Sequence, residues 1–170
     1  MSTALRTHLI KPLAVCALAA AALAPVNAYA APSGAAAPSA RPASVVVVTS
    51  GQRLDLGHGQ WLTLTAAQVC DGSGPTVENC SSVTNGNQGP GTVSLLTSGD
   101  TAGTLYRALY LGSGAARITV RAGQQNDTLR LVRLAGDTGY TVGYGWGAPQ
   151  TTGNVTTTVY NAAGTVLTTL

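Results

Sequence analysis

The residue best suited to acid–base chemistry near neutral pH is histidine, and this chain has two, His8 and His58. Asp55 lies three residues before His58, so the pair could in principle activate a serine nucleophile. However, Gly57 and Gly59 flank His58 in a pattern typical of a turn, and the chain contains no GxSxG motif. We therefore expect an exposed turn histidine and no catalytic residue. A small extracellular hydrolase that uses His58 is kept as a second alternative function.

Metal and carboxylate chemistry have little support in the sequence. The segment Asp71-Gly72-Ser73-Gly74 begins like a calcium loop, but the D-x-[DN]-x-[DN]-G pattern fails at Ser73 and Pro75. The six acidic residues are scattered and form no evident catalytic pair. We therefore expect no metal ligand, no cofactor and no enzymatic activity.

The most distinctive motif is GYTVGYGWG, from Gly139 to Gly147. In a strand, successive side chains point to opposite faces, so one face would be aromatic and the other nearly bare. An inward aromatic face would belong to the core, and the glycines would allow close backbone approach. An outward face would offer a platform to a sugar ring or an extended peptide, and residues of the segment 104–111 could widen it. The candidate binding residues are Tyr106, Arg107, Tyr110, Tyr140, Tyr144 and Trp146.

The first 30 residues have the pattern of a secretory signal peptide. Arg6, His8 and Lys11 form a basic region, Leu13–Ala24 is wholly apolar, and Ala28-Tyr29-Ala30 provides a cleavage site. The apolar run is about a dozen residues long, whereas a membrane-spanning helix needs about twenty. We expect cleavage after Ala30, a secreted, extracellular protein and no stable membrane insertion.

In an exported protein, the two cysteines left after cleavage, Cys70 and Cys80, most simply form a disulfide. The bridge would close a loop from Asp71 to Asn79 and stabilise it by about 3 kcal/mol. A rigid loop of this kind could block a protease, so a secreted protease inhibitor is the first alternative function. A redox or metal pair would instead need CxxC spacing or further ligands nearby, which the sequence lacks.

Three segments follow from composition and periodicity: a signal peptide (1–30), a Pro/Ala-rich disordered linker (31–42) and a single domain (43–170). The domain shows period-two alternation and turns rich in Gly, Asn and Asp, without helical periodicity. We expect an all-β fold, an antiparallel β-sandwich of Ig-like type with about seven to nine strands.

Individual segments give more specific expectations. The four-valine run in Ser44–Thr49 suits a strand buried on both faces. The longest irregular piece is expected at 66–91, where Asn85–Gly91 is typical of a binding loop. Residues 124–127 are expected to form a hairpin loop, and 154–170 a final hairpin that turns at Asn161–Gly164.

Three segments carry a family resemblance: GQWL at 59–62, LAGDTGY at 134–140 followed by Gly145-Trp146, and VYNAAGTVL at 159–167. Together with the Ala-rich signal, they resemble segments of small exported actinobacterial proteins of uncharacterised function. The resemblance is spread over most of 45–170. It implies a secreted bacterial β domain and assigns no catalytic residue.

The charge pattern excludes one class of partner. Cleavage would remove Arg6 and Lys11, leaving seven dispersed arginines against six acidic residues and no lysine. A nucleic-acid binder needs a clustered basic surface, so we expect no nucleic-acid partner. The sequence favours a secreted, non-enzymatic binding domain, and the candidate partners are an extracellular polysaccharide, another cell-surface polymer or a protein.

Overall fold

The computed structural model describes residues 44–136, 138–149 and 153–170, which form thirteen strands and no helix. The all-β prediction is confirmed, although seven to nine strands was too low a count. The predicted signal peptide and linker lie outside the described residues. In the part of the chain that is described, no helix is long and apolar enough to cross a membrane.

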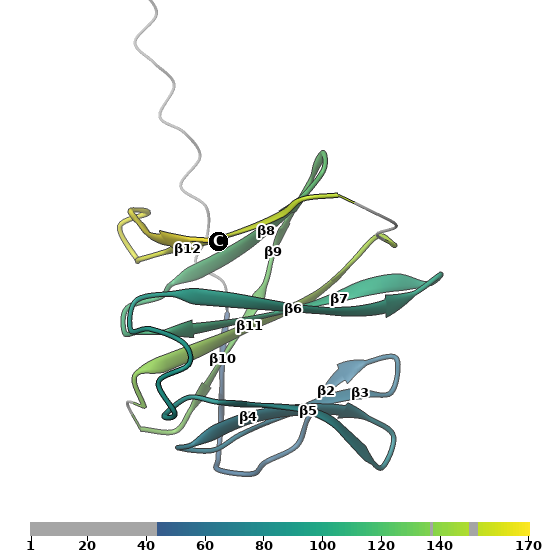
Figure 1. The fold of residues 1–170 in the computed structure, drawn as a ribbon, viewed down its shortest axis with the longest axis horizontal. Helices are drawn as coiled ribbons and strands as arrows, with labels where there is room; N and C mark the ends of the chain where they lie inside the picture. The colour runs from purple at the N-terminus through teal and green to yellow at the C-terminus, as the bar shows by residue number, and fades with distance from the viewer. Residues whose placement is uncertain (1–43, 137, 150–152) are drawn as a thin grey trace, which may run out of the picture. The chain divides into compact units, whose positions relative to one another are not determined.

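The strands form three sheets (Figure 1). The central sheet has the order β1 (Val45–Val48), β10 (Arg130–Leu134), β11 (Tyr140–Gly147), β7 (Gly103–Leu111) and β6 (Val93–Asp100). The N-terminal sheet has the order β2 (Leu54–Gly57), β3 (Gln60–Leu64), β4 (Gln68–Ser73) and β5 (Thr76–Ser82). The C-terminal sheet has the order β13 (Val166–Thr169), β12 (Val155–Tyr160), β8 (Arg117–Ala122) and β9 (Gln125–Thr128). Neighbouring strands are antiparallel except β1 and β10, which are parallel.

The central sheet lies between the other two, so both of its faces are covered (Figure 1). On β7, Leu105 and Leu109 belong to the apolar cluster shared with the N-terminal sheet, which we call the first core. Tyr106, Ala108 and Tyr110 point the other way, into the second core shared with the C-terminal sheet. The sandwich prediction is therefore confirmed, with three layers of sheet, while the Ig-like assignment stays a prediction.

The bare face of β11 is what allows the C-terminal sheet to approach. A Cβ atom on Gly143 would lie 3.1 Å from Leu129 and 3.2 Å from Ile118, and one on Gly145 would lie 3.1 Å from Leu129. These are closer than most real Cβ contacts, so a larger residue would push the layers apart. The glycines of β11 thus allow close packing, as one of the two sequence-based interpretations required.

The valine run was wrongly predicted to be buried on both faces. Val46 and Val48 pack against the first core, but Val45 is 40% exposed and Val47 63% exposed. Val45 and Val47 are exposed because β1 is an edge strand of the central sheet and pairs only with β10.

Two expected loops are strands. Residues 68–82 form the β4–β5 hairpin, in which Cys70 and Cys80 are direct cross-strand partners, and residues 125–128 form β9. The Cys70 and Cys80 sulfur atoms lie 2.09 Å apart, at disulfide-bonding distance, as predicted. The C-terminal hairpin is also confirmed: β12 and β13 pair across a turn in which the Gly164 N–H donates to the Asn161 carbonyl at 3.0 Å.

Candidate functional site

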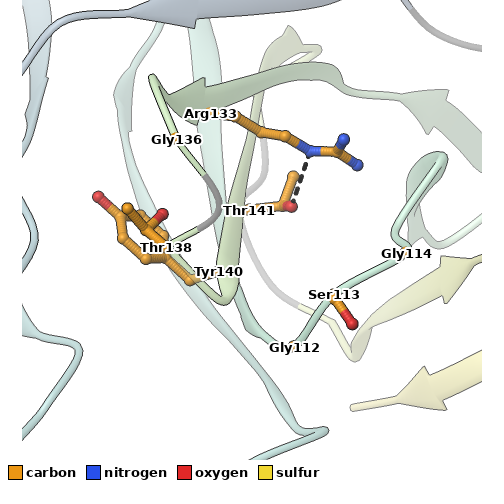
Figure 2. Close-up of a pocket in the computed structure, with 8 residues that line it drawn as sticks. All are labelled: Gly112, Ser113, Gly114, Arg133, Gly136, Thr138, Tyr140 and Thr141. Atoms are coloured by element: carbon orange, nitrogen blue, oxygen red, sulfur yellow. Dashed lines mark hydrogen bonds between the residues drawn. The ribbon is translucent and has the colours of Figure 1, made fainter.

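A polar hollow opens where β7 and β10 end and β11 begins. Its volume is about 280 Å³. Glycine-rich loops after β7 and β10 form much of its wall, and the remaining wall comes from the strands themselves (Figure 2). We call it the arginine hollow, and its lining residues are Gly112, Ser113, Gly114, Arg133, Gly136, Thr138, Tyr140 and Thr141.

Among the described lining residues Arg133 is the only charged side chain, and it is held in place on two sides. Its Nε donates to the Thr141 hydroxyl at 3.2 Å, and its Nη2 donates to the Ala115 carbonyl. Figure 2 shows the guanidinium above Thr141, directed toward the side where Ser113 and Gly114 lie. The guanidinium has five N–H donors, and these two bonds leave others available to a ligand. Within the described residues, no carboxylate forms an ion pair with Arg133; Asp137, four residues on, lies outside them.

Tyr140 connects this end of β11 to the N-terminal sheet. Its hydroxyl donates to the Thr65 carbonyl at 2.8 Å, and its ring is part of the first core. Burial raises the pKa of Tyr140 to about 12, so the phenol is neutral at physiological pH. Tyr140 therefore acts as a fixed, uncharged part of the wall.

A second, more apolar hollow of about 350 Å³ adjoins the first and shares Gly112, Thr138 and Tyr140 with it. Its other wall comes from the loop between β5 and β6, which contains Asn85–Gly91, the predicted binding loop. We call it the loop hollow. It is also lined by Val83, Thr84, Gly86, Gln88, Pro90, Gly91, Leu111 and Gly139.

Gln88 fixes the conformation of this loop. Its side-chain amide donates to the Leu109 carbonyl at 2.9 Å and to the Thr92 carbonyl at 3.0 Å. Its side-chain oxygen accepts a hydrogen bond from the Ser94 hydroxyl at 2.8 Å. The loop is thus attached to both β6 and β7, and the loop hollow has a defined wall.

The proposed aromatic platform is not an exposed surface. Tyr140 and Tyr144 belong to the first core, and Tyr106 and Tyr110 to the second. Of the predicted face, only Trp146 is partly exposed. Because both faces of the central sheet are covered, the inward interpretation holds for the tyrosines and the outward one does not.

Arg107, another candidate binding residue, is buried in an ion pair with Asp71. The pair joins β7 of the central sheet to β4 of the N-terminal sheet, and the Asn79 amide donates to the second Asp71 oxygen at 3.4 Å. Burial lowers the pKa of Arg107 to about 10, which still leaves it charged at neutral pH. Arg107 therefore connects two sheets and is not accessible to a ligand.

His58 occupies the turn between β2 and β3, with a φ of 53°, as the flanking glycines indicated. Its ring stacks on Trp146 with centroids 4.3 Å apart, and the Trp146 indole N–H donates to the Leu56 carbonyl at 2.7 Å. Asp55 accepts a hydrogen bond from the Gly57 N–H at 2.8 Å. In the described contacts Asp55 and His58 are not bonded to each other, so this pair does not form the Asp–His hydrogen bond of a catalytic triad.

A third hollow, of about 410 Å³, lies beside this turn and is lined by Arg53, Asp55, Gly59, Gln60 and Trp61. The Arg53 guanidinium lies 4.4 Å above the Trp61 ring, and the ring is buried beneath it. The stacked arginine therefore covers the aromatic face that a sugar would need.

Among the described side chains, no group of three or more His, Cys, Asp or Glu residues could hold a metal ion.

Sequence reasoning missed the arginine hollow. Arg133 occurs in the segment RLVRL, where alternation makes it look like any solvent-facing residue. The available signal was the pair of glycine-bracketed polar segments, GSG at 112–114 and GDTG at 136–139, which are typical of loops.

No protein-family model matches this chain. Searches of curated proteins and of solved structures likewise give no match.

Proposed function

We propose that this protein is a secreted, non-enzymatic binding domain that holds a carbohydrate or another cell-surface polymer at the loop end of its central sheet. The observation that carries the proposal is the fixed guanidinium of Arg133 in a polar hollow beside an apolar one. Small-molecule sites typically combine such apolar walls with a few well-placed polar groups. Secretion is supported by the pattern of residues 1–30.

The lining chemistry suits a polymer rich in hydroxyl groups. Ser113 and Thr138 offer hydroxyls that can both donate and accept. Gly112, Gly114 and Gly136 place backbone groups in the wall of the hollow, because glycine has no side chain of its own. The loop hollow adds the apolar side chains of Val83, Pro90 and Leu111, against which the less polar face of a sugar could pack.

The proposal is tested by pull-down of the secreted protein with insoluble polysaccharides and by a glycan array. The variant Arg133→Gln should lose binding at least tenfold, since a charged hydrogen bond contributes about 1.5–3 kcal/mol. The control is Arg130→Gln, which changes the net charge equally on the same strand but removes an exposed arginine outside both hollows. Failure to bind any polysaccharide, or equal losses in the two variants, would contradict the proposal.

A second candidate function is protease inhibition, and β5 is the feature that favours it. β5 is an edge strand of the N-terminal sheet, and Thr76–Cys80 is exposed along its length. An exposed edge can pair with another extended chain, and the bond between Cys70 and Cys80 stiffens it. Inhibition of a protease panel that disappears on reduction would support this function. A polysaccharide-binding protein without inhibitory activity would exclude it.

A further inference from the structure

We infer that Asn85 is a site of spontaneous chemical modification, at which the backbone nitrogen of Gly86 attacks the side-chain amide and a carboxylate is formed. The two residues lie in the loop between β5 and β6, and Asn85 is exposed to solvent. The inference concerns the covalent chemistry of the loop itself. It therefore goes beyond the proposed function and does not depend on which ligand the protein binds.

The reaction is an intramolecular acyl transfer followed by hydrolysis. The Gly86 nitrogen gives its proton to hydroxide and forms a bond to Asn85 Cγ, while the bond from Cγ to Nδ2 breaks. Nδ2 takes a proton from water and leaves as ammonia, so that a cyclic imide remains. Water then opens this ring at either carbonyl, which yields aspartate or isoaspartate. The net change is water consumed and ammonia released, and no oxidant, reductant or further reagent is needed.

The loop holds the amide of Asn85 ready for attack. The Asn87 N–H donates to Asn85 Oδ1 at 3.0 Å, and the Asn85 N–H donates to Ser82 Oγ at 3.2 Å. Negative charge develops on Oδ1 when the nitrogen adds to Cγ, and a backbone N–H already directed at this oxygen stabilises that charge. Among the described residues Nδ2 donates no hydrogen bond, so no contact with the protein must break when it leaves.

The attacking residue is the least hindered one that a chain can offer. Gly86 has no Cβ atom beside its nitrogen. Its φ is 78°, in the left-handed region, and no atom lies within 4 Å of the position that a Cβ atom would take. Neither a side chain of its own nor a neighbouring group therefore crowds this residue when its nitrogen approaches Asn85.

Other asparagines lack this combination. Asn85 is the only asparagine in the sequence that glycine follows. The Asn79 amide donates to a buried carboxylate at 3.4 Å, which holds the group that would have to leave. Asn161 Oδ1 accepts the Thr165 N–H at 2.9 Å, so its carbonyl is polarised as that of Asn85 is, but the next residue is Ala162. Asn161 is therefore a matched internal control for the role of the glycine.

The product differs from the original protein in charge and in backbone length. Either opening of the ring replaces a neutral amide with a carboxylate, so an acidic form accumulates as the protein ages. Isoaspartate also adds a carbon to the backbone before Gly86, which lines the loop hollow. Because Gln88 is bonded to the Leu109 carbonyl on β7, the added length must be taken up within the few residues before Gln88.

The test follows the purified, folded protein during incubation at neutral and mildly alkaline pH. Trypsin places Asn85 and Asn161 in separate fragments, 54–107 and 134–170, so mass spectrometry measures both in one sample. We expect Asn85 to convert at least about tenfold faster than Asn161, because poor placement of reacting atoms by about 1 Å can cost about 10²-fold in rate. The rate should rise with pH, and an assay for isoaspartate should detect the product in fragment 54–107.

Two variants and an unfolded sample complete the experiment. Gly86→Ala should slow the conversion of Asn85 by about tenfold or more, because it puts a Cβ atom on the attacking residue. Asn85→Asp should have the charge of the acidic form from the start and should gain no further acidic form from this loop. Conversion at the same rate at Asn85 and Asn161, or an unchanged rate in Gly86→Ala, would overturn the inference. Slower conversion in the folded protein than in the guanidinium-unfolded chain would also overturn it, because the loop would then protect Asn85.

Discussion

The buried ion pair between Arg107 and Asp71 provides the sharpest test of the three-layer fold. The variant Arg107→Met removes the cation and keeps most of the apolar stem. Asp71 would then stay buried between two sheets, with the Asn79 amide at 3.4 Å as its remaining side-chain partner among the described residues. Removing one partner of a buried pair typically costs about 3–5 kcal/mol, because an uncompensated charge is left behind.

The same energy can be expressed as a change in melting temperature. A domain of about 130 residues has an unfolding entropy of about 0.27 kcal/mol per kelvin, so the loss corresponds to a Tm lower by about 10–20 °C. The double variant Arg107→Met with Asp71→Leu replaces both charges with apolar groups. It should be close to the wild-type stability or above it, since packed apolar residues often replace a buried pair without loss.

The assay is guanidinium unfolding followed by tryptophan fluorescence. Trp61 lies in the N-terminal sheet, and Trp146 of the central sheet bonds to Leu56 of the N-terminal sheet, so both indoles report on this layer contact. Arg130→Met is the matched control, and this exposed site should change stability by less than about 0.5 kcal/mol. A single-variant cost below about 1 kcal/mol, as for a surface pair, would refute the reasoning, and so would a double variant equal to the sum of the two singles.

Three further predictions concern single positions. Thr157→Val should leave stability unchanged or raise it by about 1 kcal/mol in thermal unfolding, because its fully buried hydroxyl has no hydrogen-bond partner in the described structure; a loss above 1 kcal/mol would reveal a hidden partner. Burial raises the pKa of the Tyr140 phenol from 10.0 to about 12. The buried, neutral phenol therefore contributes its full stabilisation below pH 10, and this contribution is lost as pH rises toward 12. The absorbance titration at 295 nm should therefore lose a high-pH step in Tyr140→Phe, and a lost step near pH 10 would contradict the burial argument. Gly72→Ala should destabilise the fold by several kcal/mol in unfolding measurements, which is at least the usual cost of overpacking. The added Cβ atom would lie 2.0 Å from the Thr76 carbonyl oxygen, so the backbone would have to move. Gly89→Ala is the control, because its Cβ atom would meet a side chain at an ordinary distance of 3.6 Å.

Much of the strand content followed from the sequence because period-two alternation is a local property. The valine run, the GYTVGYGWG segment and the final hairpin were expected to form strands, and they are β1, β11, β12 and β13. β4 and β5 were missed because Gly, Ser, Pro and Asn are typical of turns. In the protein, cross-strand pairing and the bridge between Cys70 and Cys80 hold this segment extended. Tertiary contacts therefore overrode local propensity.

The candidate site could not be predicted for a different reason. Alternation shows which residues share a face, but it does not show whether that face meets solvent or another sheet. Tyr106 and Tyr110 share a face as predicted, and that face is buried by the C-terminal sheet. Arg107 and Arg133 look alike in sequence, yet one is paired with Asp71 while the other lines a hollow. Their difference comes from which strands become neighbours.

The layered arrangement limits where a ligand can bind. Both faces of the central sheet are occupied by the two cores, so its strands have no free face along most of their length. Binding residues must then come from strand edges or from loops at strand ends. At the loop end, Gln88 and Tyr140 attach the surrounding segments to the cores through side-chain hydrogen bonds. A loop site held in this way keeps its side chains in the positions that the sheets define, and a selective binding site needs such fixed positions.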